Sequence, residues 1–160
     1  MAAIAAGLLM CRKEKNELQF FLVHPGGPFY AKKNEGVWSI PKGLPEKDEE
    51  ILQTATREFF EETGIQPQGP FYALGSIKQK SGKTVHAWTF EGEWNSHQGI
   101  RSNVCKIEWP PRSKKFIDIP EVDRAEWMAY DRACKMINPH QVPFLIKAME
   151  ILELDKPIIP

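Results

Sequence analysis

The chain has 160 residues, of which 42% are hydrophobic and 26% charged, and this composition excludes disordered and fibrous proteins. Its length suits one globular unit with its own core, so we expect residues 1–160 to form a single domain. Because 21 Lys and Arg balance 21 Asp and Glu, no overall field favours DNA, a membrane or an acidic partner. Any affinity for phosphate must be local.

The N-terminal apolar stretch, residues 2–10, is far shorter than the ~20 residues that a membrane span requires. Arg12 and Lys13 follow this stretch rather than precede it, which favours a first strand over a secretory signal. The 3 cysteines are far apart and show no ligand spacing, which is typical of a reducing compartment. We therefore expect a cytoplasmic protein that does not cross a membrane and has neither disulfides nor zinc.

The predicted elements are mostly strands, identified by apolar alternation, with helices identified by their longer period. In chain order they are strands at 4–11 and 18–23, a helix at 49–63, strands at 72–77, 85–94, 104–109 and 125–130, a short helix at 131–137 and a helix at 142–154. Turns rich in Gly and Pro separate them, and none is long enough to mark a domain boundary. This order predicts an α+β domain in which helices cover a central mixed sheet.

The helix at 49–63 is expected to have defined ends and one apolar face. Asp48 is a suitable N-cap, and Gly64 is suited to end the helix in the left-handed conformation. At ~100° per residue, one apolar stripe should pack on the sheet. It consists of Ile51, Leu52, Ala55 and Phe59.

Three glutamates share the last two turns of this helix. Measured from the middle of the apolar stripe, Glu62 lies at ~−20°, Glu58 at ~−60° and Glu61 at ~−120°. Like charges at these spacings repel by a few tenths of a kcal/mol per pair, and the helix dipole adds ~0.3–1 kcal/mol each. Arg57 is the only cation within the helix, so ordinary pairing with surface lysines does not explain the cluster. A hard divalent cation with oxygen ligands would offset the repulsion.

Residues 43–65 resemble the Nudix box at every fixed position. The box is Gly, five residues, Glu, seven residues, Arg-Glu, an aliphatic or aromatic residue, any residue, Glu-Glu, any residue, Gly and an apolar residue. The resemblance implies the Nudix fold, an α/β/α sandwich with a central mixed sheet. It also implies a hydrolase that cleaves a phosphoanhydride bond in a nucleoside diphosphate linked to another moiety.

The resemblance assigns roles to individual residues of the box. The implied ligands of Mg²⁺, or of Mn²⁺, are Glu58, Glu61, Glu62 and the backbone carbonyl of Gly43. One of these glutamates, or a residue elsewhere, would be the general base for the attacking water. Arg57 would pair with Glu49 and stiffen the box, a mainly structural role.

Candidate substrate contacts outside the box are fewer. Lys42 stands beside the metal loop, where its ammonium would reach a substrate phosphate, although a solvated lysine is the competing interpretation. His86 and Trp88 alternate in phase on one strand and would face the same cleft, although a lone strand histidine is more often structural. Trp38 is expected in the core rather than as a stacking platform.

Three further segments have two interpretations each. The loop at 24–33 is either a lid that brings His24, aromatics and lysines over the cleft, or only a connection. The basic loop at 109–115 would contact phosphate or RNA, or is a solvated run of charges. Glu121 is a candidate extra acid, because family members sometimes recruit one from a downstream loop.

The substrate class is narrowed by the residues around the box. Trp-Ser-Ile-Pro-Lys-Gly at 38–43 looks most like nucleoside triphosphate pyrophosphohydrolases and dinucleoside polyphosphate hydrolases. The proline typical of ADP-ribose enzymes is absent at 79–82, and the tyrosine typical of one dinucleoside-polyphosphate group is missing too. We expect a small-molecule nucleotide substrate and a monomer or homodimer. The alternatives are an RNA 5′-end pyrophosphohydrolase, which the neutral net charge disfavours, and a non-catalytic module that senses nucleotides or binds a protein. Such modules usually lose a box glutamate, and this chain keeps them all.

Overall fold

A computed structural model describes residues 3–153, and its centre is a six-stranded sheet. The strand order is β4-β5-β1-β2-β8, and β3 pairs with β1 beside β2. The strands are β1 (Ile4–Glu14), β2 (Glu17–Pro25), β3 (Lys42–Gly43), β4 (Tyr72–Lys78), β5 (Thr84–Glu91) and β8 (Val122–Ala129). Because β1 runs parallel to β5 while the other pairs are antiparallel, the sheet is mixed, as predicted.

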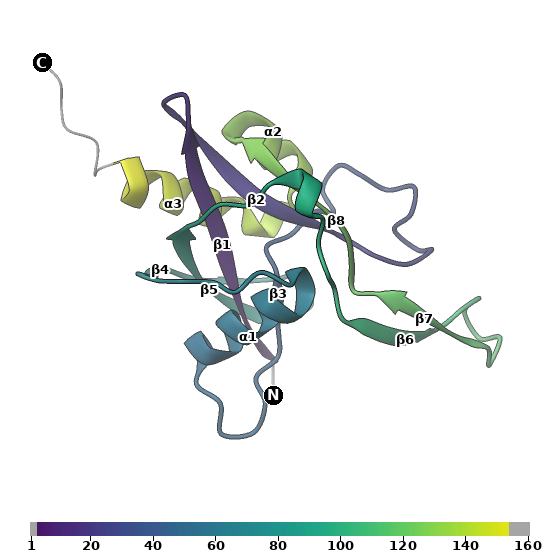
Figure 1. Cartoon of the computed structure of the whole chain (residues 1–160). Helices are drawn as coiled ribbons and strands as arrows, with labels where there is room; N and C mark the ends of the chain where they lie inside the picture. Colours follow the sequence, from purple (N-terminus) through teal and green to yellow (C-terminus); the bar gives the residue numbers. More distant parts are fainter. Residues whose placement is uncertain (1–2, 154–160) are drawn as a thin grey trace, which may run out of the picture.

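Helices cover both faces of this sheet (Figure 1). They are α1 (Ile51–Thr63), α2 (Tyr130–Met136) and α3 (Val142–Glu153). The short 3₁₀ turn η2 (Pro139–Gln141) joins α2 to α3, and a second one, η1 (Ser96–Gln98), follows β5. Helix α1 packs on one face, and α2 and α3 pack on the other. The predicted α/β/α sandwich is therefore confirmed. Among the described residues, none of the helices has the length and apolar character needed to span a bilayer.

The alternation of strand β1 explains why two cores form. Ala6 and Leu8 point towards α1, whereas Ala5 and Leu9 point towards α3, and all four are fully buried. Side chains of a strand point to opposite faces in turn, so one apolar run can supply two layers. Each buried leucine contributes ~1.5–3 kcal/mol to this packing. The long apolar run at the N-terminus is thus the central strand of the sandwich.

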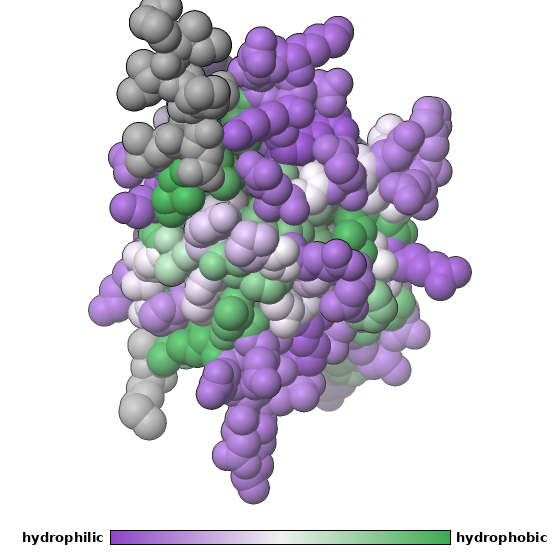
Figure 2. Space-filling view, turned by 60° about the vertical axis from the view of Figure 1, so that its left-hand side comes forward, coloured by the Kyte–Doolittle hydropathy of each residue, from purple (hydrophilic) through white to green (hydrophobic). Residues whose placement is uncertain are grey.

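A two-stranded hairpin, residues 104–120, leaves the body of the molecule and is called the arm below (Figure 1). Its strands are β6 (Val104–Glu108) and β7 (Phe116–Pro120), and they pair only with each other. Val104 and Phe116 are exposed on it. Elsewhere on the surface, the face shown in Figure 2 carries hydrophobic patches near its middle with hydrophilic side chains around them. No residue of the two arm strands is buried, so the arm has no core of its own.

The predicted elements are all present, but several of their bounds differ and two strands were not predicted. Strand β5 ends at Glu91, and Trp94 lies beyond it as a buried side chain whose indole donates to the Gly99 carbonyl (2.8 Å). The strands β3 and β7 were missed because one is very short and the other ends in proline. Helix α1 begins at Ile51 rather than at residue 49. Residue 154, the predicted end of the last helix, lies outside the described residues.

Candidate active site

Helix α1 carries the acids of the box. The sequence predicted its C-terminal end correctly but not its N-terminal end. The N-cap is Glu50, whose backbone N–H donates to the Gln53 side chain (3.0 Å), so the prediction of Asp48 was wrong. Asp48 has φ 62° and lies in the turn before the helix, which delays the first helical residue. Gly64 ends the helix at φ 79°, as predicted, and its N–H donates to the Phe60 carbonyl (2.7 Å).

Three carboxylates meet where α1 faces the junction between β7 and β8. Glu58 and Glu62 stand one turn apart on α1, and Glu121 comes from that junction. One oxygen of each lies within 4.8 Å of the others. The structure therefore brings together two of the three box glutamates with the acid that was only a downstream candidate.

The carboxylates of this cluster are close enough to raise one another's pKa. Burial raises the pKa of Glu62 well above its usual range, and the nearby Glu58 and Glu121 carboxylates raise it further, while Lys42 opposes the rise. The pKa of Glu121 is also raised, first by burial and then by Glu58 and Glu61. Oε2 of Glu62 is buried and has no hydrogen-bond partner among the described residues. Buried charges normally pair or bind a metal, and these oxygen donors fit a divalent cation.

Gly43 allows the backbone of β3 to approach this cluster. A Cβ atom on Gly43 would overlap the Glu58 carboxylate, so a side chain is excluded at this position. Gly43 pairs with Ala6 on β1, and that pairing holds the loop before the helix against the sheet. The glycine at the start of the box is therefore explained by close approach of a carboxylate.

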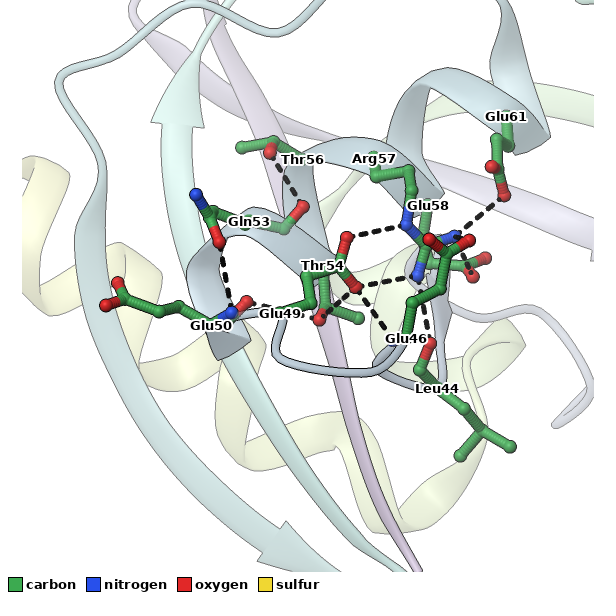
Figure 3. A network of polar contacts seen from close by, with 10 residues as sticks. All are labelled: Leu44, Glu46, Glu49, Glu50, Gln53, Thr54, Thr56, Arg57, Glu58 and Glu61. Carbon is green, nitrogen blue, oxygen red and sulfur yellow. Dashed lines mark hydrogen bonds and ion pairs between the residues drawn. The ribbon is translucent and has the colours of Figure 1, made fainter.

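Arg57 is the centre of a second polar network on α1 (Figure 3). Its Nε and Nη2 donate to the two oxygens of Glu49 (2.8 and 2.9 Å), and hydrogen bonds from Arg57 lower the Glu49 pKa to about 2. Its Nη1 donates to Glu58 (2.9 Å) and to Glu61 (3.0 Å). The same side chain also reaches the Leu44 carbonyl (3.0 Å). Arg57 is thus more than a stiffener of the box, because besides Glu49 it contacts two further acids of the box, Glu58 and Glu61, directly.

Glu61 has a different environment from the other two box glutamates. Its carboxylate turns to Arg57, and its side chain is 36% exposed. It is not among the three acids whose oxygens converge. Its position is consistent with its angle on the helical projection, since it is the acid furthest from the apolar stripe. The arrangement separates Glu61 from the buried acids Glu58 and Glu62.

A cavity of about 190 Å³ opens beside the carboxylates and is lined by Lys42, Glu62 and Glu121 together with apolar residues of β2 and β8. Burial lowers the pKa of Lys42, and Lys83 lowers it further, whereas the carboxylates favour its charged form. The structure therefore brings Lys42 next to the acids, as the sequence suggested. A half-buried lysine in the wall of this cavity is suited to bind an anionic group.

His86 and Trp88 lie on β5 at some distance from the acids. His86 pairs with Ala6, which on its other side pairs with Gly43, so two strand spacings, ~10 Å, separate His86 from Gly43. Trp88 packs on the α1-side core. Both side chains share the face of the sheet that carries α1, but the structure does not place them in the carboxylate cluster.

His24 is a structural residue, so the lid interpretation of its loop fails for the histidine. The ring is fully buried, with Nδ1 2.8 Å from an Asp123 oxygen and Nε2 2.7 Å from the Lys33 carbonyl. It packs edge-on against Trp38, at 5.3 Å between ring centroids. Trp38 is also fully buried, as predicted, and its indole donates to Asn34 (2.8 Å).

Asn103 is a residue at the site that the sequence did not indicate. Its backbone N–H donates to the Glu61 carbonyl (2.8 Å), and its own carbonyl accepts from the Glu121 N–H (3.0 Å). Hydrogen bonding from its side chain counteracts the rise in the Glu121 pKa. Neither a motif nor a spacing marks this asparagine, so only the fold reveals its position.

Comparison with known proteins places this site in a family. Nucleoside diphosphate-linked moiety X motif 6 of Mus musculus is 46% identical over 48 residues, which is 30% of this chain and 15% of that protein. The mRNA-decapping protein g5R of African swine fever virus is 30% identical over 110 residues, 66% of this chain and 42% of that protein. This chain therefore spans less than half the length of either curated relative.

Among solved structures, a C. elegans Ap4A hydrolase in a binary complex matches 95% of this chain and 98% of that chain, with a TM-score of 0.67 and 20% identity. At that identity the likeness concerns the fold. The NUDIX domain model matches residues 1–147. The resemblance seen in the box is thereby confirmed, and the chain belongs to the NUDIX domain family.

Proposed function

We propose that this protein is a hydrolase that uses a divalent cation, Mg²⁺ or Mn²⁺, to cleave a phosphoanhydride bond in a nucleoside diphosphate linked to another moiety. The observation that carries the proposal is the convergence of Glu58, Glu62 and Glu121 within 4.8 Å of one another. The unpartnered oxygen of Glu62 and the closely approaching backbone of Gly43 add to it. Membership of the NUDIX domain family supports the same reaction class.

The side chains would divide the work as follows. Glu58, Glu62 and Glu121 hold the cation, which when bound neutralises phosphate charge and lowers the pKa of a coordinated water. A carboxylate of the cluster accepts the proton of the attacking water, a contribution of ~10²–10⁴-fold. Lys42 donates to a phosphate oxygen from the wall of the cavity. Arg57 keeps Glu58 and Glu61 in place.

The size of the cavity bears on the substrate. At about 190 Å³ it is smaller than the ~300–1,000 Å³ of typical ligand pockets, so it has room for phosphate groups but not for a whole nucleotide. The nucleoside would then rest on the surface outside. We favour a nucleoside triphosphate or a dinucleoside polyphosphate, and the fold shared with an Ap4A hydrolase supports that choice. We further propose that the protein is a monomer or homodimer in the cytoplasm.

The test is a release assay for phosphate and nucleotide over nucleoside triphosphates, dinucleoside polyphosphates, nucleotide sugars and ADP-ribose. Each substrate is assayed with Mg²⁺ and with the cation chelated. We expect cleavage of one class that requires the cation and disappears in Glu62→Gln. Turnover that persists with the cation chelated would contradict the proposal. Silence across the panel while Mg²⁺ binds would favour a nucleotide-sensing module.

A second candidate, hydrolysis at the 5′ end of RNA, is favoured by the arm. Strand β7 leads directly into Glu121, and the opposite end of the arm carries exposed cations at Arg112, Lys114 and Lys115. At ~3.3 Å per residue, Lys115 is ~20 Å from the carboxylates, which is beyond a single nucleotide but within reach of a polynucleotide chain. The similarity to a decapping protein supports this candidate.

The two candidates are separated by a double variant, Lys114→Ala with Lys115→Ala. If RNA is the substrate, removing two phosphate contacts should weaken binding of 5′-triphosphate RNA. The slope of log affinity against log salt concentration should also become shallower, by about the amount that two phosphate contacts contribute. Turnover of ATP should not change. Equal effects on both substrates, or on neither, would contradict an RNA role for the arm.

A further inference from the structure

The first part of the connection between β2 and β3, residues 26–33, is called the β2 loop below, and it begins at the wall of the cavity. Pro25, the last residue of β2, lines the cavity. The Gly26 N–H donates to the Glu121 carbonyl (3.0 Å), and a Cβ on Gly26 would overlap the Pro120 carbonyl, so this contact requires glycine. The connection leaves the sheet on the side of the molecule that carries the arm (Figure 1). The β2 loop thus starts from the backbone of one of the three acids.

The other end of the β2 loop is fixed by the buried His24. Nε2 of His24 donates to the Lys33 carbonyl (2.7 Å), and the opposite ring nitrogen lies 2.8 Å from an Asp123 oxygen. The Lys33 N–H donates to the Tyr30 carbonyl (3.0 Å), which closes a turn inside the loop. Both ends of the β2 loop are therefore bonded to residues beside the cavity, and its tip has a defined place relative to the acids.

The tip carries a Phe29 ring that is contacted on one face and on one edge. The Lys33 ammonium lies over the ring, 3.7 Å from its centroid. The Tyr30 ring stands nearly perpendicular to it at 4.8 Å, and the ammonium is 5.9 Å from the Tyr30 centroid. Seen from Phe29, these distances place Tyr30 at close to a right angle to the ammonium, so Tyr30 meets the ring edge. Neither neighbour covers the opposite face, and Phe29 is 55% exposed.

Four aromatic side chains are exposed in the described part of the chain, and they differ in their surroundings. They are Phe29, Phe60, Tyr72 and Phe116. Single exposed apolar side chains are common and need no function. Phe60 is two residues from Glu62 on α1, so the two side chains point to opposite sides of the helix. Of the four, Phe29 alone has a cationic side chain over its ring, which fixes the ring in the open.

The distance from the cavity to Phe29 matches the length of a nucleotide. The cavity, at about 190 Å³, has room for phosphate groups but leaves the nucleoside outside. Four residues of chain separate Phe29 from Pro25, so at most ~14 Å separates their Cα atoms. An extended nucleoside polyphosphate spans a comparable distance from its terminal phosphate to its base. A nucleotide whose phosphates lie at the acids therefore reaches the open face of Phe29.

We propose that Phe29 is the stacking platform for the nucleobase of the substrate, and that Lys33 and Tyr30 hold its ring in the orientation that the base meets. The inference rests on the proposed function, because it places the phosphates of the substrate at the three carboxylates. Every base has a π-face, so the platform selects for the presence of a base rather than for its identity. Stacking of one base on an aromatic side chain contributes about 5–100-fold in affinity.

The experiment compares two probes that share a diphosphate and differ in the nucleoside. One is the ADP analogue in which a methylene group replaces the oxygen between the phosphates, and the other is methylenediphosphonate. Neither contains an anhydride that the enzyme can cleave. Calorimetric titration of the whole chain with each probe, in saturating Mg²⁺, gives the affinities of the wild type and of Phe29→Ala. We expect Phe29→Ala to bind the ADP analogue about 5–100-fold more weakly and methylenediphosphonate within about twofold of the wild type.

Two further variants separate stacking from loss of bulk and from loss of fold. Phe29→Trp keeps an aromatic face and should bind the ADP analogue within about threefold of the wild type. Phe60→Ala removes a phenylalanine of similar exposure (48%) from the outer side of α1 and should leave the affinity for both probes unchanged. The unfolding temperature of each variant shows that it is folded, which is expected because the Phe29 side chain is exposed.

The other outcomes each overturn a different statement. Equal losses for both probes in Phe29→Ala would show that Phe29 supports the phosphate site and not the base. Wild-type affinity of Phe29→Ala for the ADP analogue would show that the base lies elsewhere, as would a loss in Phe29→Trp as large as that in Phe29→Ala. If the wild type binds both probes equally well, the inference fails while the phosphate site stands. If the wild type binds neither probe in Mg²⁺, the proposed function fails and the inference fails with it.

Discussion

Helix α1 and the junction between β7 and β8 supply acids to the same site by different means. On α1, Glu58 and Glu62 are one turn apart, and the helix fixes their relation without help from the rest of the chain. Glu121 stands at the foot of the arm, where its carbonyl accepts from the Gly26 N–H and its N–H donates to the Asn103 carbonyl. The next N–H, of Val122, donates to Ser102 Oγ, so the place of Glu121 depends on contacts of the junction backbone. The helix therefore determines spacing locally, and the junction depends on tertiary contacts.

The comparison indicates where the site should be robust and where it should be sensitive. A change at the foot of the arm can move Glu121 without moving Glu58 and Glu62, because the Glu121 backbone is bonded to Asn103 and Gly26, which are not residues of α1. A change on α1 moves two acids and the Arg57 network together. Substitutions at the foot of the arm should therefore change cation affinity alone. Substitutions on α1 should change both cation affinity and the stability of the fold.

The largest effect is expected from the buried acids of α1. Glu58→Gln and Glu62→Gln should each reduce turnover by at least ~10²-fold, because each removes a charge that the proposed cation requires. The fold should survive, since Glu62 is buried among like charges and an amide there relieves repulsion. Initial rates with saturating Mg²⁺ and unfolding temperatures of cation-free protein measure the two effects.

Retained activity in both variants would contradict the assignment of the cation site. A loss of activity accompanied by unfolding would instead indicate that the glutamates support the structure. The unfolding temperature therefore decides how a loss of rate is interpreted.

A second prediction compares an acid of each region directly. Glu121→Gln should weaken Mn²⁺ binding by ~10–100-fold, and Glu61→Gln by less, although Glu61 belongs to the box and Glu121 does not. The reason is geometric, because Glu61 faces Arg57 while Glu121 faces the other acids. Titration of both variants with Mn²⁺ tests the ranking. A larger loss for Glu61→Gln would restore the assignment that the resemblance implied.

The ranking of Glu121 and Glu61 separates the features of the site that the sequence could predict from those that it could not. The 3.6-residue period placed Glu58 and Glu62 beside the core and Glu61 further round, and the structure agrees. Gly64 could be recognised as a cap because only its own backbone conformation is involved. Features that depend on a few neighbouring residues were therefore accessible from the sequence.

Features that depend on distant contacts were not accessible. Nothing near His24 in the sequence announces Asp123, yet that pair holds the histidine in the core. The start of α1 was misplaced because a turn with positive φ at Asp48 competes with its capping preference. Asn103 acts through backbone groups of α1 and of the junction, which no local pattern can indicate. The fold class followed from the order of elements, whereas these contacts required the three-dimensional arrangement.

A smaller effect, on stability, is expected at the centre of the α1 network. Arg57→Lys keeps the charge but loses the paired hydrogen bonds to Glu49, and should cost about 1.5–3 kcal/mol of unfolding free energy. The matched control is Arg132→Lys, which breaks a similar but exposed pair with Glu126 (3.2 and 3.3 Å) and should cost at most about 0.5 kcal/mol. Urea unfolding at neutral pH measures both. Equal costs would show that the hydrogen bonds of Arg57 stabilise the fold no more than the exposed pair of Arg132 and Glu126 does.

The smallest expected effect is a dependence of stability on pH in which two carboxylates act in opposite directions. The Glu49 pKa is lowered from 4.5 to about 2, so its contribution is present above pH 4.5 and is lost as pH falls towards 2. The Glu62 pKa is raised, so its ionisation opposes folding, and cation-free protein should gain stability as pH falls from neutral towards 4.5. Urea unfolding across this range should therefore show a maximum near pH 4.5. Glu49→Gln should reduce the acid-side decline, and Glu62→Gln should reduce the slope on the neutral side, to which Glu121 also contributes because its pKa is raised as well. A wild-type curve that declines steadily from pH 7 towards pH 2 would contradict the opposing signs, because it would show that ionisation of Glu62 does not oppose folding.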